Sequence, residues 1–198
     1  LRYNTETEFM EVYKGSAWEP ITSPPTITSI SPTTTIITGT EDVRTAAYQT
    51  EILHPTPTAG DEFGNYVSLS SDGTYLIVGS NFDDPGGAQT GSVQVYIRSG
   101  TSWAWQAELV HPNPISNDYL GRSVSISGDG LYALVGVPSR DPPGTGDGGA
   151  AQVFVRNSDP GVTPQWTWQA ELVHPSPVTS DNFGYSVSIS SDGTYALV

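Results

Sequence analysis

Residues 106–135 read QAELVHPNPISNDYLGRSVSISGDGLYALV, and residues 169–198 read QAELVHPSPVTSDNFGYSVSISSDGTYALV. The two stretches align without gaps and are identical at 21 of 30 positions. Residues 49–78, which read QTEILHPTPTAGDEFGNYVSLSSDGTYLIV, match the last copy at 17 of 30 positions. The copies start 57 and then 63 residues apart, which indicates a repeat architecture with one structural unit per copy.

Each unit contains four short segments with the pattern of β-strands. In the second unit they are Glu108–His111, Ser123–Ser127, Tyr132–Val135 and Ala151–Val155. The second segment alternates apolar residues with serines, and the Asp129-Gly130 pair that follows it is typical of a tight hairpin turn. Four strands per unit predict an all-β protein made of β-propeller blades with four antiparallel strands each. A sandwich or a β-solenoid is the alternative.

The serine face of each unit predicts close packing between blades, because small side chains allow neighbouring strands to approach near the propeller axis. Residues 49–198 hold two and a half such blades. A closed propeller needs roughly four to eight blades. We therefore expect the natural polypeptide to continue for several blades beyond residue 198.

The composition excludes several classes of protein. The chain has 7 basic and 21 acidic residues, a formal net charge of −14, and Lys14 is its only lysine. Such a charge repels a phosphate backbone, so we expect no nucleic-acid partner. No apolar run approaches the roughly 20 residues of a membrane helix, so we expect no membrane insertion. Hydrophobic residues make up 36% of the chain, which argues against disorder throughout, and the absence of cysteine excludes disulfides.

Residues 49–198 resemble the FG-GAP repeats of integrin-type β-propellers. The resemblance rests on an aromatic-Gly step, the Val-Ser-Leu/Ile-Ser strand after it, the Asp-Gly turn, a Val-Gly step and a Trp-x-Trp ending. The clearest of these are Phe63-Gly64, Phe183-Gly184, Val78-Gly79 and Val135-Gly136. The middle unit departs from the pattern, with Leu120-Gly121 in place of Phe-Gly. The resemblance implies a β-propeller, and the pattern is more similar to the calcium-free repeats of microbial and viral surface proteins than to those of integrins.

Residues 1–21, LRYNTETEFMEVYKGSAWEPI, resemble short modules of phage tail-fibre proteins and large algal-virus structural proteins. We expect a β-hairpin from Leu1–Asn4 and Phe9–Tyr13, with Trp18 covering its apolar side. A piece of this size cannot hold a core alone and must pack on a neighbour. Residues 22–48 are rich in Thr and Pro and are expected to form an extended linker.

The histidines and glutamates of the repeats are interpreted as structural. His54, His111 and His174 occupy the same repeat position before a proline. A catalytic or metal-binding residue is normally unique, whereas a residue present in every repeat unit normally has a structural role in that unit. Their expected partners are backbone groups or carboxylates, among which the recurring Glu51, Glu108 and Glu171 are candidates. With no Gly-x-Ser-x-Gly elbow and no phosphate-binding loop, the sequence predicts no catalytic residue and no cofactor.

The Asp-Gly turns are not expected to bind calcium. Integrin-type repeats carry calcium on Asp-x-Asp/Asn-x-Asp-Gly-x-x-Asp loops, and the resemblance places that pattern on Asp72, Asp129 and Asp192. The two preceding ligand positions are serines in each unit, and the last is Leu76, Ala133 or Ala196. One carboxylate per loop does not offset the dehydration of a divalent cation. The weaker metal candidates are Asp83, Asp84 and Asp141, in acidic loops.

Two tryptophan pairs allow two interpretations. Trp103 and Trp105 recur as Trp166 and Trp168, and each pair lies on one face of a strand. Buried, the indoles pack between blades; exposed, they are platforms on which sugar rings can stack. Their recurrence at matching repeat positions favours packing.

The sequence as a whole predicts a structural virion protein, such as a capsid-surface, fibre or tail component. It would stand on the virion surface, contact other virion structural proteins, and present loops Phe82–Thr90 and Ser139–Gly149 to a host receptor or glycan. The alternative is an extracellular or cell-surface adhesin that binds a protein or glycan through the same loops. A propeller hydrolase is a third and more remote interpretation.

Overall fold

The computed structural model describes residues 50–142, 146–159 and 161–198, together with the backbone of four strands nearer the N-terminus. Every regular element in these parts of the chain is a β-strand, which confirms the all-β class. The four N-terminal strands are β1 (Arg2–Asn4), β2 (Phe9–Lys14), β3 (Ala17–Pro20) and β4 (Thr34–Ile36). Other expectations for residues 1–49, including the position of the Trp18 side chain, lie outside the described residues.

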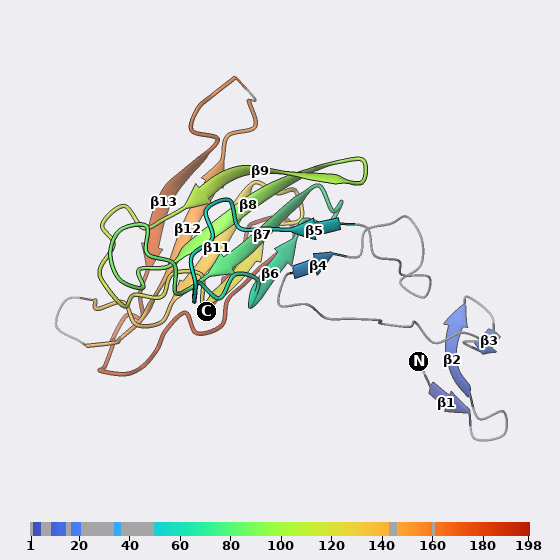
Figure 1. Cartoon of the computed structure of the whole chain (residues 1–198). Helices are drawn as coiled ribbons and strands as arrows, with labels where there is room; N and C mark the ends of the chain where they lie inside the picture. The colour runs from blue at the N-terminus through green and yellow to red at the C-terminus, as the bar shows by residue number, and fades with distance from the viewer. Residues whose placement is uncertain are drawn as a thin grey trace.

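Two four-stranded antiparallel sheets form the centre of the structure (Figure 1). Their strands lie in chain order, β6-β7-β8-β9 in the first sheet and β10-β11-β12-β13 in the second. We call these sheets blade 1 and blade 2, and their arrangement confirms the predicted propeller blades. Blade 1 contains β6 (Tyr66–Leu69), β7 (Tyr75–Ser80), β8 (Ser92–Ser99) and β9 (Ser102–Leu109). Blade 2 contains β10 (Ser123–Ile126), β11 (Tyr132–Val137), β12 (Ala150–Arg156) and β13 (Trp166–Leu172).

Shorter sheets flank the two blades in the sequence. Strands β14 (Ser188–Ile189) and β15 (Ala196–Leu197) pair as β10 and β11 do, and they begin a third blade. Near the N-terminus, β1, β2 and β3 form an antiparallel meander, of which β1 and β2 correspond to the expected hairpin. Strand β4 lies within the segment expected to be a linker and pairs with β5 (Thr50–Ile52).

Strand β9 is longer than the sequence pattern suggested. The expected strand Glu108–His111 is the end of an element that begins at Ser102, and His111 itself lies outside it. The Trp103-Ala-Trp105 stretch pairs with the second half of β8, and a bulge between Val95 and Tyr96 accommodates one extra residue in β9. The tryptophans are therefore part of the outermost strand of the blade.

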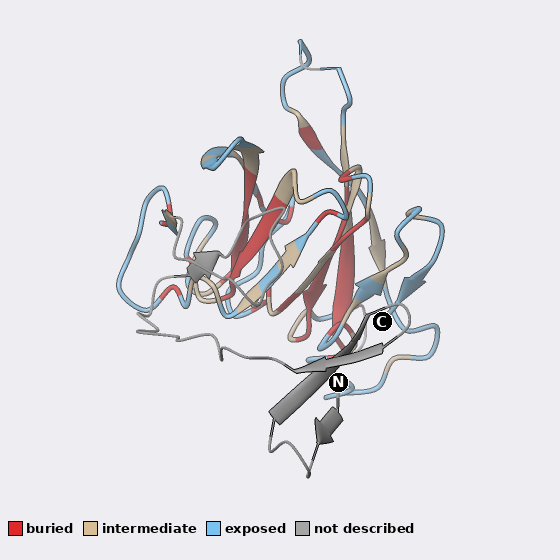
Figure 2. Ribbon diagram, turned by 90° about the vertical axis from the view of Figure 1, so that its right-hand side faces the viewer, coloured by how far each residue is buried: buried red, intermediate tan, exposed pale blue. Residues whose placement is uncertain are grey.

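The second strand of each blade is buried on both faces. From Leu76 to Ser80 in β7, and from Ala133 to Val137 in β11, every residue is buried. Their near-continuous apolar sequences, YLIVGS and YALVGV, fit strands covered on each side. Figure 2 shows that the buried residues concentrate in the strands, whereas the connecting loops are exposed.

The main hydrophobic core lies between blade 1 and blade 2. Blade 1 contributes Ile77, Val93, Val95 and Leu109; blade 2 with its leading loop contributes Leu120, Ile126, Ala133, Val135, Val137, Phe154 and Trp166. The other face of β7 and β8 packs in a second cluster with Ile52, Phe63 and Trp103. Each fully buried aliphatic or aromatic side chain contributes about 1.5–3 kcal/mol, so the blades depend on their neighbours for most of their apolar burial.

Serine hydroxyls link the innermost strands of successive blades. Ser68 Oγ in β6 accepts the backbone N–H of Ile126 in β10 at 3.1 Å. One blade later, Ser125 Oγ accepts the N–H of Ile189 in β14, again at 3.1 Å. The polar side of the alternating strand therefore faces the next blade and supplies hydrogen-bond acceptors to it, as the close-packing prediction requires.

Glycines allow the backbones of adjacent blades to touch at one end of these strands. A Cβ at Gly79 would lie 2.2 Å from the carbonyl oxygen of Gly121, and a Cβ at Gly136 would lie 1.9 Å from that of Gly184. Since both obstacles are backbone atoms, no side-chain rotation can relieve the overlap. The glycine of the Val-Gly step in one blade therefore packs against the backbone of the glycine that follows the aromatic or leucine residue in the next repeat.

We predict that Gly136→Ala destabilises the protein by about 3 kcal/mol, because the new methyl group must push blade 3 away from blade 2. The free energy of unfolding from urea titration measures the effect. Gly146→Ala is the matched control, since its Cβ would meet only a methyl group of Thr179 at 4.0 Å. Equal effects of the two substitutions would show that this contact carries no special constraint.

Candidate functional site

A buried glutamine organises the outer half of each blade. In blade 1, Gln94 Nε2 donates to Glu108 Oε1 at 2.8 Å, and Gln94 Oε1 accepts the indole N–H of Trp105 at 2.8 Å. Blade 2 repeats both bonds, also at 2.8 Å, with Gln152, Glu171 and Trp168. The recurring glutamate and the second tryptophan of each pair therefore satisfy a buried amide, which is a structural task.

Arginines at the end of the third strand hold the Asp-Gly turns. Arg98 Nε donates to the carbonyl oxygen of Gly73 at 2.6 Å, and Arg156 Nε donates to that of Gly130 at 2.8 Å. The Arg156 guanidinium also lies over the ring of Tyr75 in blade 1, 4.3 Å from its centroid. These two arginines fix the hairpin between the first and second strands of their blades.

The carboxylates of the Asp-Gly turns bind groups of their own hairpins. Asp72 accepts hydrogen bonds from Ser70 Oγ at 2.7 Å, and from the amide and hydroxyl of Thr74 at 2.9 and 2.6 Å. The hydrogen bonds from Thr74 and Ser70 lower the pKa of Asp72 to about 2. Asp192 has the same partners, Ser190 and Thr194, and its pKa is likewise lowered to about 2. These local bonds give the aspartate a role in the turn; the expectation that the turns bind no calcium stays a prediction.

The His-Pro steps share one hydrogen bond. The ring Nδ1 atom accepts the N–H of the residue two positions later, at 3.2 Å in His54, 3.0 Å in His111 and 3.3 Å in His174. His54 and His111 are buried, and His174 is exposed. An Nδ1 atom that accepts a hydrogen bond leaves the proton of a neutral imidazole on Nε2.

In blade 2, this histidine belongs to a satisfied ionic network. His111 Nε2 lies 3.2 Å from Glu171 Oε2, and Arg140 Nη1 lies 2.9 Å from Asp118 Oδ2. Arg140 Nε lies 3.4 Å from Glu171 Oε2, so one guanidinium serves both carboxylates. Burial raises the pKa of Asp118, although the Ile115 amide and the Arg140 charge oppose the increase. We call His111, Asp118 and Arg140 the blade 2 slot.

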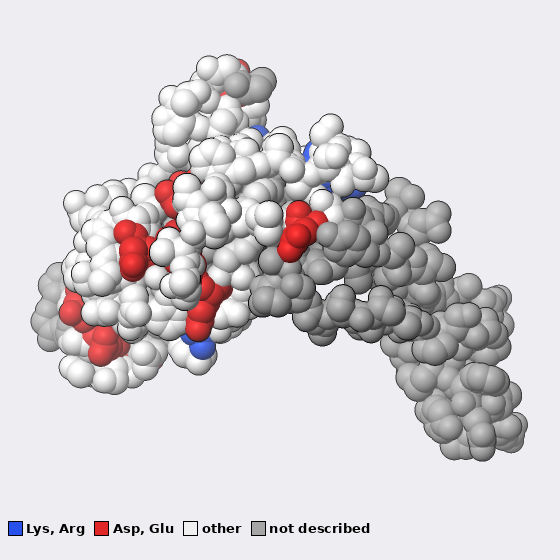
Figure 3. Space-filling model, in the orientation of Figure 1, with Lys and Arg blue, Asp and Glu red and all other residues white. Residues whose placement is uncertain are grey.

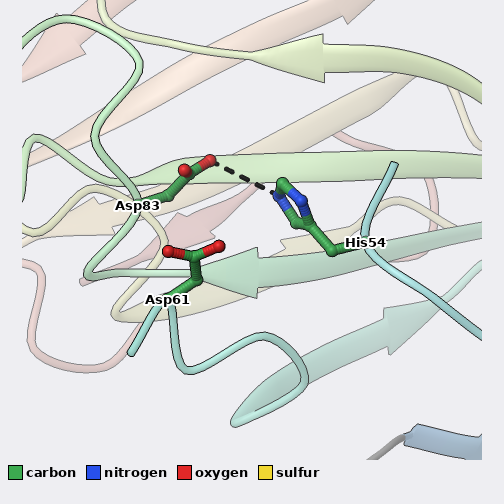
Figure 4. A group of neighbouring side chains, drawn as sticks. All are labelled: His54, Asp61 and Asp83. Carbon is green, nitrogen blue, oxygen red and sulfur yellow. Dashed lines mark ion pairs between the residues drawn. The ribbon is translucent and has the colours of Figure 1, made fainter. Parts of the chain in front are cut away.

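The blade 1 slot has the same position in the repeat but a different charge. His54 and Asp61 correspond to His111 and Asp118, whereas Asp83 stands where blade 2 has Arg140. All three side chains are buried, and one ligand atom from each lies within 4.8 Å of the others. His54 Nε2 is 3.4 Å from Asp83 Oδ2, and Figure 4 shows the imidazole directed at the two carboxylates.

Three hydrogen bonds hold the carboxylates of the blade 1 slot, and one of them runs from the Asp84 amide to Asp83 Oδ1 at 3.0 Å. Asp61 Oδ2 accepts the amide of Thr58 at 2.6 Å, and Asp83 Oδ2 accepts the Ser92 hydroxyl at 2.6 Å. Within the described residues, this is the one group of three histidine or carboxylate side chains with a spacing that suits a metal ion. It is the candidate functional site of the chain.

Comparison with known families agrees with this repeat-by-repeat description. A family model for the FG-GAP repeat matches residues 49–96 and 103–154, just over half of the chain. The chain belongs to the FG-GAP repeat family. The first matched segment covers β5, β6, β7 and the first part of β8, and the second covers nearly all of β9, then β10, β11 and most of β12. The FG-GAP match therefore follows the blades described above.

Other comparisons add little about the role of this FG-GAP chain. It is similar to the periplasmic gluconolactonase PpgL of Pseudomonas aeruginosa, with 20% sequence identity and a TM-score of 0.37. The similarity covers 66% of this chain and 34% of PpgL, so the chain spans about a third of that protein's length. No curated protein matches the chain. Among the described residues, no helix has the length and apolar character to cross a membrane.

The three acidic metal candidates have different environments. Asp83 is part of the blade 1 slot. Asp84 Oδ1 accepts the backbone amide of Gln89, and Asp141 Oδ1 accepts that of Asp147 at 2.6 Å, so both stabilise their own loops. Asp83 was predicted from its acidic loop alone, and its two neighbours in the slot were not. Asp61 recurs as Asp118 and Asp181, and this recurrence was the signal that could have found it.

The tryptophan pairs divide between the two interpretations. Trp166 is buried between blade 1 and blade 2 and donates to Gln106 Oε1 at 3.0 Å, while Trp103 packs on the cluster around Tyr96. Trp105 and Trp168, in contrast, are 51% and 42% exposed. The first indole of each pair therefore packs between blades, and the second presents an exposed surface whose N–H is bound inward.

We predict that Arg140→Met lowers the free energy of unfolding by about 3 kcal/mol at pH 7, because it leaves buried Asp118 without its cation. The loss should shrink toward pH 4. Burial raises the pKa of Asp118 in the native state, so removing Arg140 penalises the ionised carboxylate and hardly affects the protonated acid. Urea titrations at both pH values measure this. Arg140→Lys, which keeps the charge, is the control; a pH-independent loss would contradict the ionic explanation.

Proposed function

We propose that the chain is a non-catalytic structural protein of a virus particle, in which FG-GAP blades form a rigid scaffold for surface loops. The observation that carries this proposal is the use of the repeated polar residues. The buried glutamines, the glutamates paired with them, the arginines on the Asp-Gly turns and the serines on the innermost strands all bind groups of their own or the adjacent blade. Such a set builds a scaffold and offers no nucleophile with an adjacent base.

Loops between the second and third strands supply the variable surface. In the loop Phe82–Thr90, residues 84–86 and 88 are exposed, and Phe82 packs edge-on against Tyr119 with 5.2 Å between ring centroids. The corresponding loop of blade 2 differs in length and sequence. Acidic patches dominate the charged groups on the face drawn in Figure 3. A host receptor or glycan would contact these loops, and a basic partner surface would complement their charge.

The virion assignment rests on the N-terminal segment. Residues 1–21 resemble modules of phage tail-fibre and large algal-virus structural proteins, and β1 to β3 are too small a sheet to hold a core. Packing against other virion structural proteins would bury its apolar residues. This arrangement would leave the blades at the virion surface.

A second candidate function, an extracellular adhesin, is favoured by the exposed indoles. Trp105 and Trp168 lie at matching positions of two blades, and each is anchored by a hydrogen bond to a buried glutamine. Rigid exposed aromatic rings are suitable platforms for sugar rings. An adhesin would carry the same blades on a cell surface instead of a particle.

Immunogold electron microscopy with antibodies against residues 50–198 tests the proposal on purified virions and on the cells that produce them. We expect gold on the outer surface of intact particles, and the chain among the proteins identified by mass spectrometry of the same particles. Label on the surface of uninfected cells, with none on particles, would replace the virion assignment with the adhesin. Label in neither place would contradict both.

A further inference from the structure

We propose that the blade 1 slot, formed by His54, Asp61 and Asp83, binds a divalent cation of the calcium and magnesium class through carboxylate oxygens. The site is formed by the segment that precedes β6 and the loop that follows β7, away from the Asp-Gly turns. In blade 2, a guanidinium provides the positive charge at the same position.

In blade 2, a side chain of the protein itself neutralises the buried carboxylates at this position. The Arg140 guanidinium lies 2.9 Å from Asp118 and 3.4 Å from Glu171. In blade 1, Asp83 replaces the arginine, so the slot loses one positive charge and gains one negative charge. Burying two carboxylates side by side without a cation is unfavourable, and a bound cation compensates their charge.

Two further positions next to the slot are also more polar in blade 1 than in blade 2. Val137 and Pro138 at the end of β11 correspond to Ser80 and Asn81 at the end of β7. Ser80 lies opposite Ser92 in the β7–β8 pair, and opposite residues share a face of the sheet. Since the Ser92 hydroxyl donates to Asp83, Ser80 lies on the face that Asp83 contacts. Blade 1 therefore adds oxygen-bearing side chains where it loses the arginine.

Several polar atoms in this region are buried and have no hydrogen-bond partner. Among the described residues, four such side-chain atoms occur, and three of them belong to this region: Ser80 Oγ, Asn81 Oδ1 and His54 Nε2, whose 3.4 Å approach to Asp83 Oδ2 is an ion-pair contact without a hydrogen bond. The fourth is the indole nitrogen of Trp103. Buried unsatisfied atoms are rare in native proteins, and an ion or its water ligands is a common explanation. Their concentration around a carboxylate pair indicates a missing ligand at this place.

The spacing of the slot suits an ion. The ligand atoms of Asp61 and Asp83 lie within 4.8 Å of each other, so the point midway between them is about 2.4 Å or less from both. Calcium binds oxygen at about 2.3–2.6 Å and completes its shell with carbonyl oxygens and water, and magnesium retains several waters beside one or two carboxylates. A small movement of either carboxylate brings it to these distances.

The histidine selects the class of metal. His54 Nδ1 accepts the Thr56 amide, so the neutral imidazole carries its proton on Nε2 and offers that face as a donor. A protonated nitrogen cannot ligate zinc, whereas it can hold the Asp83 carboxylate, 3.4 Å away, in position for a hard cation. His54 is therefore a positioning residue, and Asp61 and Asp83 are the ligands.

A pocket borders the site on one side. Its lining includes Leu53, His54, Pro57, Asp61, Glu62 and Phe63. Asp61 therefore lies in the wall of this pocket, and exposed Glu62 adds negative charge beside it.

Isothermal titration of the full chain with CaCl2, MgCl2 and ZnCl2 tests the proposal, together with thermal melting in EDTA and in each salt. We expect one saturable site for calcium or magnesium and a higher melting temperature in that salt. Asp61→Asn and Asp83→Asn should each weaken binding at least 10-fold. Asp141→Asn and Asp72→Asn are matched controls that should leave it unchanged.

Asp83→Arg copies blade 2 into blade 1 and gives the sharpest outcome. We expect this variant to lose the titration and to melt in EDTA near the temperature of the cation-loaded parent, because the guanidinium takes the place of the ion. Three results would overturn the proposal: no binding or melting shift in millimolar salt, saturable binding that survives in Asp83→Arg, or tight zinc binding that His54→Gln abolishes. If a basic side chain of a partner protein neutralised the Asp61 and Asp83 carboxylates instead, the isolated chain would show no binding and no melting shift in millimolar salt.

Discussion

The close contact between the backbones of adjacent blades is the constraint on which the rest of the structure depends. At Gly79 and Gly136 there is no room for a Cβ, because the carbonyl oxygens of Gly121 and Gly184 in the next blade occupy that space. This approach brings the innermost strands near enough for Ser68 and the serines after it to accept amide hydrogen bonds across the gap. The same approach brings the apolar side chains of the two blades into contact. The hydrophobic core between the blades and the serine–amide hydrogen bonds therefore both depend on these glycines.

The candidate site is a consequence of this architecture. Blade 1 and blade 2 each bring a His-Pro step, an aspartate seven residues later and the end of the second strand to the same corner, where the side chains are buried. In blade 2, Arg140 occupies this corner and forms an internal ion pair with Asp118. In blade 1, Asp83 makes the same corner acidic. Three differences between the repeats, at Ser80, Asn81 and Asp83, thus separate the internal ion pair of blade 2 from the cation site that we propose in blade 1.

Much of the fold could be predicted from the sequence because the repeat displays its own strands and turns. The alternation of Val124 and Ile126 with serines, and the apolar run after Asp129-Gly130, correspond to β10 and β11. The bulge opposite Tyr96 could not be foreseen, since it depends on how β8 and β9 pair. The split between Trp166, which is buried, and Trp168, which is exposed, depends on their distance from the interblade core.

The candidate site was harder to predict. Recurrence predicts a structural role for the histidines, and in the structure the His111 ring contacts Glu171. Comparison of the repeats also shows the exception, because Asp83 aligns with Arg140. The sequence alone does not say that these positions are buried, and burial is what turns an acidic loop residue into an uncompensated charge. Residues 60 positions apart, such as His111 and Glu171, meet only because successive copies stack.

Native-state hydrogen exchange of the amides that cross between blade 1 and blade 2 tests the central claim most directly. Leu120 donates to the carbonyl oxygen of Thr90, and Ile126 donates to Ser68 Oγ. If the blades are held together by this close backbone contact, both amides exchange only through global unfolding, as slowly as the buried amides of β7 and β11. Exchange of Leu120 and Ile126 at the rate of exposed loop amides, while β7 and β11 stay protected, would contradict the account.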